Sequence, residues 1–496
     1  MSANSPSVRS SLVFSFAERY GSLVITLLST LVLSRILTPE EIGIYSVSIA
    51  AVGLAQTLRD FGISNFLIQA KNINDDIVRT ALTLSAILSA ILCLALLLSG
   101  PMLAEYYQQP GIQSVIKIVS INMLLIPLGS TLYALLRREL RFETIAKFNL
   151  LGALMGAMVS IGSAMLGAGF MSLAYGAVAS VLVTTLGVAV KTGRKSLYKP
   201  SFTGWRELLH FGGYASTAAI SGELNARIPD FTLAKSIGFN SVGIYGKAYS
   251  AVYLVTNTIF DSVGSVFLPS VAKALRAGED AGALFHRALA YMTAIILPIY
   301  AMIYFLSGPM IHVLFGSQWS DAVPVASALA IAAGVYALGF GLEHVLIASG
   351  RIRRLLLLRV AMVIPTLAVF LTMPEHGLGL TALATAPLAL IYLSVAYYLT
   401  SDAIHLNLRK LLRIGLHSSF VATLTSIPSA ALGPLWDGSL ISALVVLLFS
   451  GLLGGIAWIT GLRVAKHALL NELSRVLTKA RVPASWQSLL LGHLPP

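Results

Sequence analysis

The chain has 496 residues, of which 56% are hydrophobic and 11% are charged, and its mean hydropathy is +0.81. A soluble domain carries about 25% charged residues, so this composition excludes an ordinary soluble protein. The single cysteine, Cys93, excludes an intrachain disulfide and leaves no pair for thiol redox chemistry.

Apolar segments long enough to cross a hydrocarbon core about 30 Å thick recur along the whole chain. The first segment is too long for the core of a signal peptide, so we expect it to remain as a membrane helix. We therefore predict an all-α integral membrane protein with about fourteen transmembrane helices. In chain order, the predicted spans are residues 11–37, 42–69, 78–99, 113–136, 145–168, 171–191, 209–235, 242–268, 284–306, 322–348, 355–373, 378–400, 411–433 and 440–461.

The distribution of the positive charges agrees with these predicted spans. Lys and Arg are retained in cytoplasmic loops, and most of the 34 basic residues fall in loops on one side when the N-terminus is placed inside. The net charge of +13 is therefore interpreted as a signal of topology, and no nucleic-acid partner is expected. We predict a multi-pass protein of a bacterial inner membrane with both termini cytoplasmic.

The C-terminal tail has a pattern of its own. From about residue 464 to 481, apolar and basic residues alternate at helical spacing, with Leu469, Leu473 and Leu477 on one side. Such a helix lies on an anionic membrane surface or stays solvated, and the sequence leaves both alternatives open.

Two stretches of the chain match each other at an offset of 200 residues. Arg35 matches Lys235, and Gly43-Ile44-Tyr45 matches Gly243-Ile244-Tyr245. The offset spans an even number of predicted helices, so the two halves would share one orientation as a parallel repeat.

The chain resembles the lipid-linked oligosaccharide flippases on residues 34–45, 58–63, 136–142 and 243–245 with Ala248. These flippases are the polysaccharide transporter family of the multidrug/oligosaccharidyl-lipid/polysaccharide (MOP) exporter superfamily. The resemblance implies two six-helix lobes at residues 1–200 and 201–400. It also implies two additional C-terminal transmembrane helices at 401–462 and a cytoplasmic amphipathic tail at 463–496.

The same resemblance implies a function. The cargo would be a polyprenyl-diphosphate-linked oligosaccharide, moved from the cytoplasmic to the periplasmic face for surface polysaccharides such as exopolysaccharide or lipopolysaccharide O-antigen. Alternating access with cation coupling is the implied mechanism. Membrane lipids are expected partners, a polysaccharide polymerase and export machinery are candidate partners, and no cofactor is expected.

Ionisable side chains inside predicted spans are the candidate functional residues, because charge at the membrane core is costly and usually faces a cavity or a partner. A guanidinium matches diphosphate oxygens with a rigid fork of donors. We therefore assign the basic residues Arg19, Arg59, Arg227 and Lys247 to the diphosphate or the cavity. The acidic candidates for cation coupling are Glu18, Asp60, Glu223, Asp230, Asp261 and Glu343.

Structural interpretations compete with these assignments. Helical spacing puts Glu223, Arg227 and Asp230 on one face, where they either line a cavity or neutralise one another as a ladder. Lys247 either acts where the cargo is released or extends its ammonium towards the membrane surface.

Other function classes are less well supported by the sequence. A membrane enzyme is not expected, because Asp-x-Asp, Gly-rich phosphate loops and His/Cys metal clusters are absent from the sequence; no catalytic residue or metal site is assigned. A multidrug/cation antiporter and a peptidoglycan lipid-precursor flippase of the same superfamily remain as alternatives.

Overall fold

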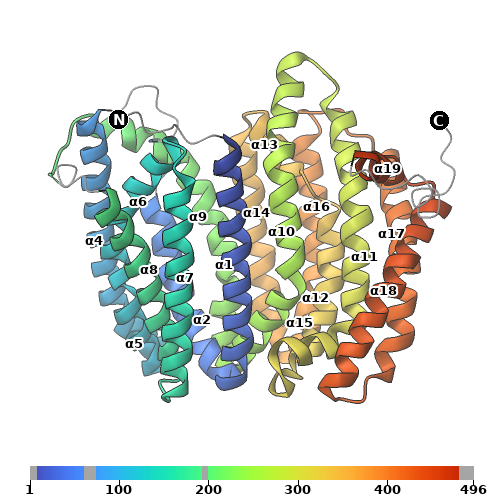
Figure 1. Ribbon diagram of the computed structural model, residues 1–496, viewed down its shortest axis with the longest axis horizontal. Coiled ribbons are helices and arrows are strands. Elements are labelled where there is room, and N and C mark those ends of the chain that lie inside the picture. The colour runs from blue at the N-terminus through green and yellow to red at the C-terminus, as the bar shows by residue number, and fades with distance from the viewer. Residues whose placement is uncertain (1–7, 61–66, 68–73, 193–198, 480–496) are drawn as a thin grey trace. The chain divides into compact units, whose positions relative to one another are not determined.

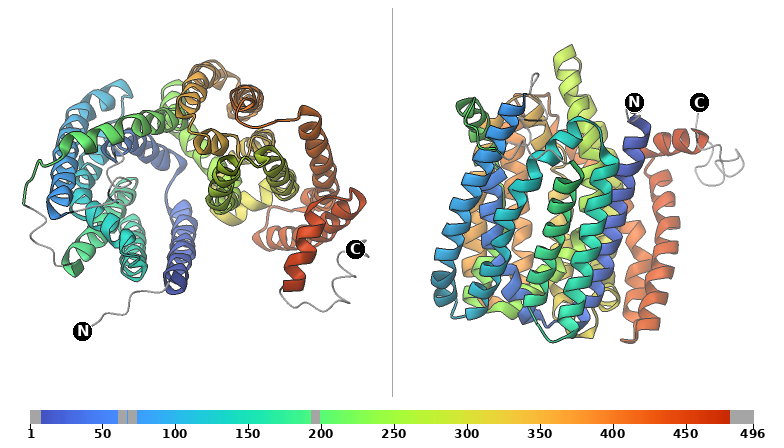
Figure 2. Two further views of the ribbon diagram at one scale, coloured as in Figure 1. Left: turned by 90° about the horizontal axis from the view of Figure 1, so that it is seen from above. Right: turned by 60° about the vertical axis from the view of Figure 1, so that its left-hand side comes forward.

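The computed structural model describes residues 8–60, 67, 74–192 and 199–479 (Figure 1). Helix is the only regular secondary structure in these ranges, and the predicted all-α fold is confirmed. The helices divide into two compact units, residues 1–243 and 244–496. In the end-on view, the long helices within each unit run side by side in roughly one direction (Figure 2).

The first unit is built from eight described helices and the start of a ninth. They are α1 (Val8–Ile36), α2 (Pro39–Asp60), α4 (Asp75–Tyr106), α5 (Pro110–Val119), α6 (Ile121–Arg138), α7 (Phe142–Met165), α8 (Met171–Thr192), α9 (Trp205–Ser236) and the first residues of α10 (Phe239–Ala277).

The second unit contains the rest of α10 and all later helices. They are α11 (Ala281–Phe315), η2 (Ser317–Trp319), α12 (Ala322–Ala337), α13 (Leu342–Ala348), α14 (Ile352–Thr372), η3 (Pro374–His376), α15 (Leu378–Leu383), α16 (Thr385–Thr400), α17 (Leu408–Leu432), η4 (Gly433–Leu435), α18 (Leu440–Val464) and α19 (Leu469–Lys479). The two lobes at residues 1–200 and 201–400, the two additional helices at 401–462 and the tail at 463–496 stay a prediction.

Twelve helical segments in the described ranges are long and apolar enough to cross a membrane. The helices α9 and α17 cover the two remaining predicted spans, but they are less apolar and do not meet the same criterion. The structure thus supports a multi-pass membrane protein, and the count of fourteen stays a prediction.

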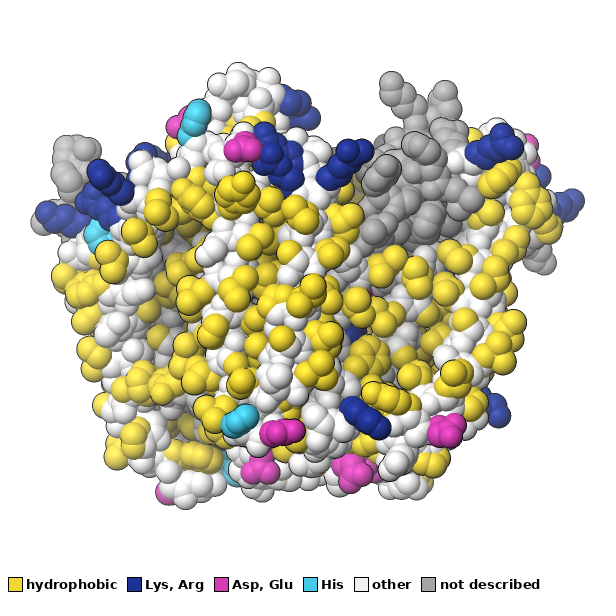
Figure 3. Space-filling view, turned by 180° about the vertical axis from the view of Figure 1, so that it is seen from behind, with side chains coloured by type: hydrophobic (Ala, Val, Ile, Leu, Met, Phe, Trp, Pro, Cys, Tyr) yellow, Lys and Arg dark blue, Asp and Glu magenta, His cyan; other side chains and the backbone are white. Residues whose placement is uncertain are grey.

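The surface of the helices agrees with this interpretation. On the face that Figure 3 draws, hydrophobic side chains lie along the flanks of the helices, and Lys, Arg, Asp and Glu side chains gather near the helix ends. An apolar flank between two polar ends is what a membrane-spanning bundle requires. Which end is cytoplasmic stays a prediction.

The start of α2 is determined by its own first residues. The Thr38 backbone N–H donates to Glu41 Oε2 at 2.8 Å, and the Glu41 N–H donates to Thr38 Oγ1 at 3.2 Å. This is a capping box, and Pro39 follows the cap at a position where a missing N–H costs nothing. The capping box therefore sets where Gly43 lies one turn later.

Gly43 and Gly243 make a reciprocal contact within the first unit. A Cβ added at Gly43 would overlap the backbone carbonyl of Phe239, and a Cβ added at Gly243 would overlap the backbone carbonyl of Pro39. The two contacts exchange under an offset of 200 residues, which is the offset of the predicted repeat. Close approach of the helix starts is why both positions need glycine.

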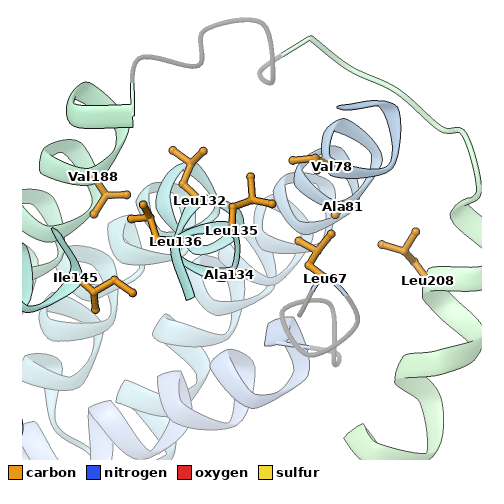
Figure 4. Close-up of a cluster of buried hydrophobic side chains, with 10 residues drawn as sticks. All are labelled: Leu67, Val78, Ala81, Leu132, Ala134, Leu135, Leu136, Ile145, Val188 and Leu208. Carbon is orange, nitrogen blue, oxygen red and sulfur yellow. The ribbon is translucent and has the colours of Figure 1, made fainter. Parts of the chain in front are cut away.

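A hydrophobic cluster joins several helices of the first unit (Figure 4). Its fully buried members come mainly from α4, α6, α7 and α8, and they are Leu67, Val78, Ala81, Leu132, Ala134, Leu135, Leu136, Ile145, Val188 and Leu208. The Arg138 guanidinium donates to the Leu67 carbonyl oxygen at 3.1 Å at the edge of this cluster. The cluster therefore ties segments that are far apart in sequence into one body.

The C-terminal helix α19 packs on its own unit. Leu469 and Leu470 are buried in a cluster with side chains of α11, α17 and α18, and Leu473 and Leu477 are partly buried there. Tyr291 of α11 donates to Glu472 Oε1 at 3.3 Å. The structure thus places the apolar side of the predicted amphipathic helix on protein, an alternative that the sequence pattern did not suggest. Residues 480–496 of the tail lie outside the described part.

Candidate functional site

The helix α9 carries a three-residue ladder of ionisable side chains. Arg227 Nε donates to Glu223 Oε1 at 2.8 Å, and Arg227 Nη1 lies 3.5 Å from Asp230 Oδ2. The shared face predicted from the helical spacing is confirmed. A guanidinium has five N–H donors and these contacts engage two of them, while 33% of the Arg227 side chain is exposed. Arg227 is therefore paired with two carboxylates and can still bind a further anion.

The helix α2 approaches this ladder at a glycine. A Cβ at Gly53 would lie 3.0 Å from Glu223 Oε1 and 3.6 Å from Arg227 Nη2. Gly53 thus leaves the room that the Glu223–Arg227 pair occupies. Gly53 could not be predicted from the sequence, because a glycine in an apolar span gives no signal of which side chains face it.

Arg59 of α2 is buried. Its exposed fraction is 6%, and Nη1 lies 4.0 Å from Met123 Sδ of α6. The Arg59 guanidinium is thus enclosed in the first unit, and its assignment to the diphosphate or the cavity stays a prediction. The side chain of its neighbour Asp60 and residues 61–63 of the quoted motif lie outside the described part.

Glu18 of α1 belongs to a second polar chain in the first unit. Its Oε1 accepts a hydrogen bond from Asn149 Nδ2 of α7, and Asn149 Oδ1 accepts one from the Tyr133 hydroxyl of α6 at 2.7 Å. Three helices are joined through these side chains. Arg19, the next residue on α1, has an exposed side chain. Asn149 and Tyr133 were missed because neither residue type carries a formal charge.

Lys247 lies in the second unit, beneath two aromatic rings. Its Nζ is 4.8 Å from the centre of the Phe315 ring and 5.5 Å from that of Trp319, and only 9% of the residue is exposed. A cation over an aromatic face is attracted by the ring quadrupole. Direct contact with a cargo would require this cover to open, so the assigned role of Lys247 stays a hypothesis.

Replacing Trp319 by Ala is expected to lower the melting temperature of the purified protein. Trp319 is fully buried, and truncating a buried Trp to Ala costs about 3–5 kcal/mol because it leaves a cavity. The change also removes one ring over Lys247. Thermal unfolding in detergent measures the effect, with Trp205→Ala as the control, because Trp205 is 43% exposed. Equal melting temperatures of the two variants would contradict the prediction.

Glu343 of α13 is the best-connected acidic candidate of the second unit. Its Oε2 accepts from Arg359 Nη2 of α14 at 2.9 Å, and its Oε1 accepts from the Tyr392 hydroxyl of α16 at 3.2 Å. Neither Arg359 nor Tyr392 was among the candidates predicted from the sequence. The remaining candidate, Asp261 of α10, has an exposed side chain.

The assigned residues therefore fall into separate groups. The α9 ladder with Gly53 and the Glu18–Asn149–Tyr133 chain belong to the first unit, and the covered Lys247 and the Glu343–Arg359–Tyr392 group belong to the second. In the ranges that the structure describes, no three His, Cys, Asp or Glu side chains gather in a way that would hold a metal ion.

Comparison with known proteins shows the family. The family described as "Polysaccharide biosynthesis protein" matches residues 32–324, which is more than half of the chain. The Escherichia coli K12 protein "Lipopolysaccharide biosynthesis protein WzxC" is 28% identical over 331 residues, covering 65% of this chain and 66% of that protein. The Rhizobium meliloti 1021 protein "Succinoglycan biosynthesis transport protein ExoT" is 23% identical over 335 residues, 67% of each chain. The chain thus spans slightly under two thirds of WzxC.

Two solved structures show the fold. The "Lipid II flippase MurJ, inward closed conformation" matches with a TM-score of 0.74 at 14% identity, over 91% of this chain and 99% of that chain. An inward-facing multidrug resistance MATE family transporter of the MOP superfamily matches with a TM-score of 0.56 at 16% identity, over 77% of this chain and 95% of that chain. At sequence identities this low, the two matches show a shared fold and nothing about function. The chain belongs to the polysaccharide biosynthesis protein family and is a multi-pass membrane protein with the fold of the MOP exporter superfamily.

Proposed function

We propose that this protein translocates a polyprenyl-diphosphate-linked oligosaccharide from the cytoplasmic to the periplasmic face of a bacterial inner membrane. The translocated unit serves surface polysaccharide biosynthesis and crosses without chemical change. Family membership supports the pathway, and the name of the relative ExoT supports transport. The observation that carries the proposal is Arg227, a guanidinium within α9 that two carboxylates hold and that remains one third exposed.

The chemistry of the cargo explains why arginine suits this place. A diphosphate spreads its negative charge over several oxygens, and a guanidinium offers them parallel N–H donors in a rigid plane. Glu223 and Asp230 hold the Arg227 side chain against one face of α9, so less conformational entropy is lost when a phosphate binds. Arg19, Arg59 and Lys247 are proposed as further basic contacts along the translocation path.

The remaining features of the mechanism are proposed with the same function. Both termini are cytoplasmic, and alternating access is coupled to a cation through one or more of the acidic candidates. The acidic residues best supported by contacts are Glu18, Glu223 and Glu343, because each is hydrogen-bonded to a side chain on its own or a neighbouring helix. A polymerase and export machinery would take over the unit after translocation.

Deleting the gene in its host is expected to make one lipid-linked oligosaccharide accumulate while a surface polysaccharide disappears. Synthesis of the unit on the cytoplasmic face continues, but its removal stops. Mass spectrometry of extracted polyprenyl-linked sugars measures the accumulation, and re-expression of the gene from a plasmid must reverse it. Intact surface polymer with retention of cationic dyes would instead support a drug exporter and contradict the proposed function.

A further inference from the structure

Five tyrosine side chains gather in the second unit, on four different helices. The Tyr249 and Tyr253 rings of α10 stack with centroids 4.3 Å apart, and the Tyr336 and Tyr392 rings of α12 and α16 stack at 4.7 Å. Tyr300 of α11 meets Tyr253 edge to face at 6.2 Å and donates to Thr256. The Phe260 ring of α10 stacks on Phe340, just after the end of α12, with centroids 5.5 Å apart, so the two stacks lie on neighbouring elements. We call this group the tyrosine cluster.

Each stack pairs a more exposed ring with a less exposed one. Tyr249 and Tyr336 are 45% and 44% exposed, whereas Tyr392 is 8% exposed and Tyr253 is partly buried. The less exposed ring supports its stacked partner, which restricts the orientations of the more exposed ring. The cluster therefore presents two aromatic surfaces.

A charged group borders the cluster. The Tyr392 hydroxyl donates to Glu343, which also accepts from Arg359, and 24% of the Glu343 side chain and 29% of the Arg359 side chain are exposed. Partly exposed charges inside membrane segments face a watery cavity or the protein interior rather than lipid. Since the exposed rings lie beside these charges, we expect the rings to face the same cavity rather than lipid.

The backbone beside the cluster is interrupted. The apolar segment from Ala322 to Ala348 is broken at residues 338–341, where α12 ends and α13 begins, and Gly341 has φ +87°. A Cβ at Gly339 would lie 3.2 Å from Tyr392 Cε1, so the turn leaves room for that ring. Non-helical backbone at membrane depth is tolerated where it is enclosed by protein or lines a water-filled cavity, and transporters use such breaks at binding sites.

We propose that the tyrosine cluster, with Glu343 and Arg359, contacts the sugar portion of the cargo. A pyranose ring has apolar C–H faces and a rim of hydroxyl groups. Aromatic rings cover the apolar faces, while a carboxylate, a guanidinium and a phenol hydroxyl serve the rim. The inference rests on the proposed function and extends it, because it assigns the saccharide to side chains of α10, α11, α12, α13, α14 and α16.

The test compares a cargo with and without sugar. The probes are the lipid-linked oligosaccharide purified from the deletion strain and undecaprenyl diphosphate, bound to the purified protein in lipid nanodiscs. Tyr336→Ala is expected to weaken binding of the lipid-linked oligosaccharide about tenfold or more and to leave undecaprenyl diphosphate binding within about twofold. Tyr336→Phe keeps the ring and is expected to bind both ligands nearly as the wild type does.

The control is Tyr398→Ala, because Tyr398 is also on α16 but is 76% exposed and stands apart from the cluster's ring contacts. It is expected to change neither affinity. Tyr249→Ala is measured in parallel under the same criterion. Equal loss for both ligands, no loss for either, or failure of both alanine variants to fold would overturn the inference and leave the cluster as packing. A wild-type protein that binds neither ligand would instead defeat the proposed function itself.

Discussion

Gly43→Ala is expected to abolish most of the folded protein. The added Cβ would overlap the backbone carbonyl of Phe239, and a backbone carbonyl cannot move aside by changing rotamer. Overpacking at a well-packed site costs about 1–3 kcal/mol, and a clash with backbone at a helix crossing belongs at or above the upper end. Fluorescence-detected size-exclusion chromatography of a tagged protein measures the folded fraction, and thermal unfolding measures what remains.

Two further variants make this prediction specific. Gly243→Ala makes the reciprocal clash with Pro39 and is expected to behave like Gly43→Ala, whereas a Cβ at Gly246 meets no atom within 4 Å. Gly246→Ala is therefore expected to retain the wild-type folded fraction. A Gly43→Ala protein as abundant and as thermally stable as the Gly246→Ala protein would show that the close approach is not required.

The second large effect is expected from removing the cation of the α9 ladder. Arg227→Ala leaves Glu223 and Asp230 without the cation that joins them, so we expect reduced protein level and loss of transport together. Removing one partner of a buried ion pair costs about 3–5 kcal/mol, and less is expected here because the ladder is partly exposed. Immunoblotting of membranes and restoration of surface polymer in the deletion strain measure the two effects separately.

A variant that removes all three charges of the ladder separates a role in transport from a role in folding. The triple variant Glu223→Gln, Arg227→Gln and Asp230→Asn keeps all three side chains polar and leaves no unpaired charge, although Gln is shorter than Arg. Under the proposed function, it accumulates to the wild-type level but does not restore the polymer. Asp76→Asn with Arg79→Gln is the matched control, because it neutralises another ion pair within one helix, on α4. Full restoration by the triple variant would mean that the ladder only makes α9 tolerable in the membrane.

The sequence by itself determined the features that depend on one segment at a time. Segment length and apolarity predicted the helices, because a chain in lipid must satisfy its backbone hydrogen bonds internally. Helical periodicity placed Glu223, Arg227 and Asp230 on one face, and the structure confirms the ladder. The reciprocal contacts of Gly43 and Gly243 follow the offset of 200 residues that the sequence shows, and the repeat itself stays a prediction.

Only the tertiary structure decided which side chains meet across helices. Glu343 pairs with Arg359 and Tyr392, and Lys247 lies beneath Phe315 and Trp319. Such pairings depend on the packing of neighbouring helices and on the rotation of each helix about its axis. Hydropathy is averaged over whole segments and contains neither quantity, so Arg359 and Tyr392 were not predicted as partners of Glu343. The apolar face of α19 is a similar case, because the sequence left a membrane surface and solvent open and the structure packs this face on α11, α17 and α18.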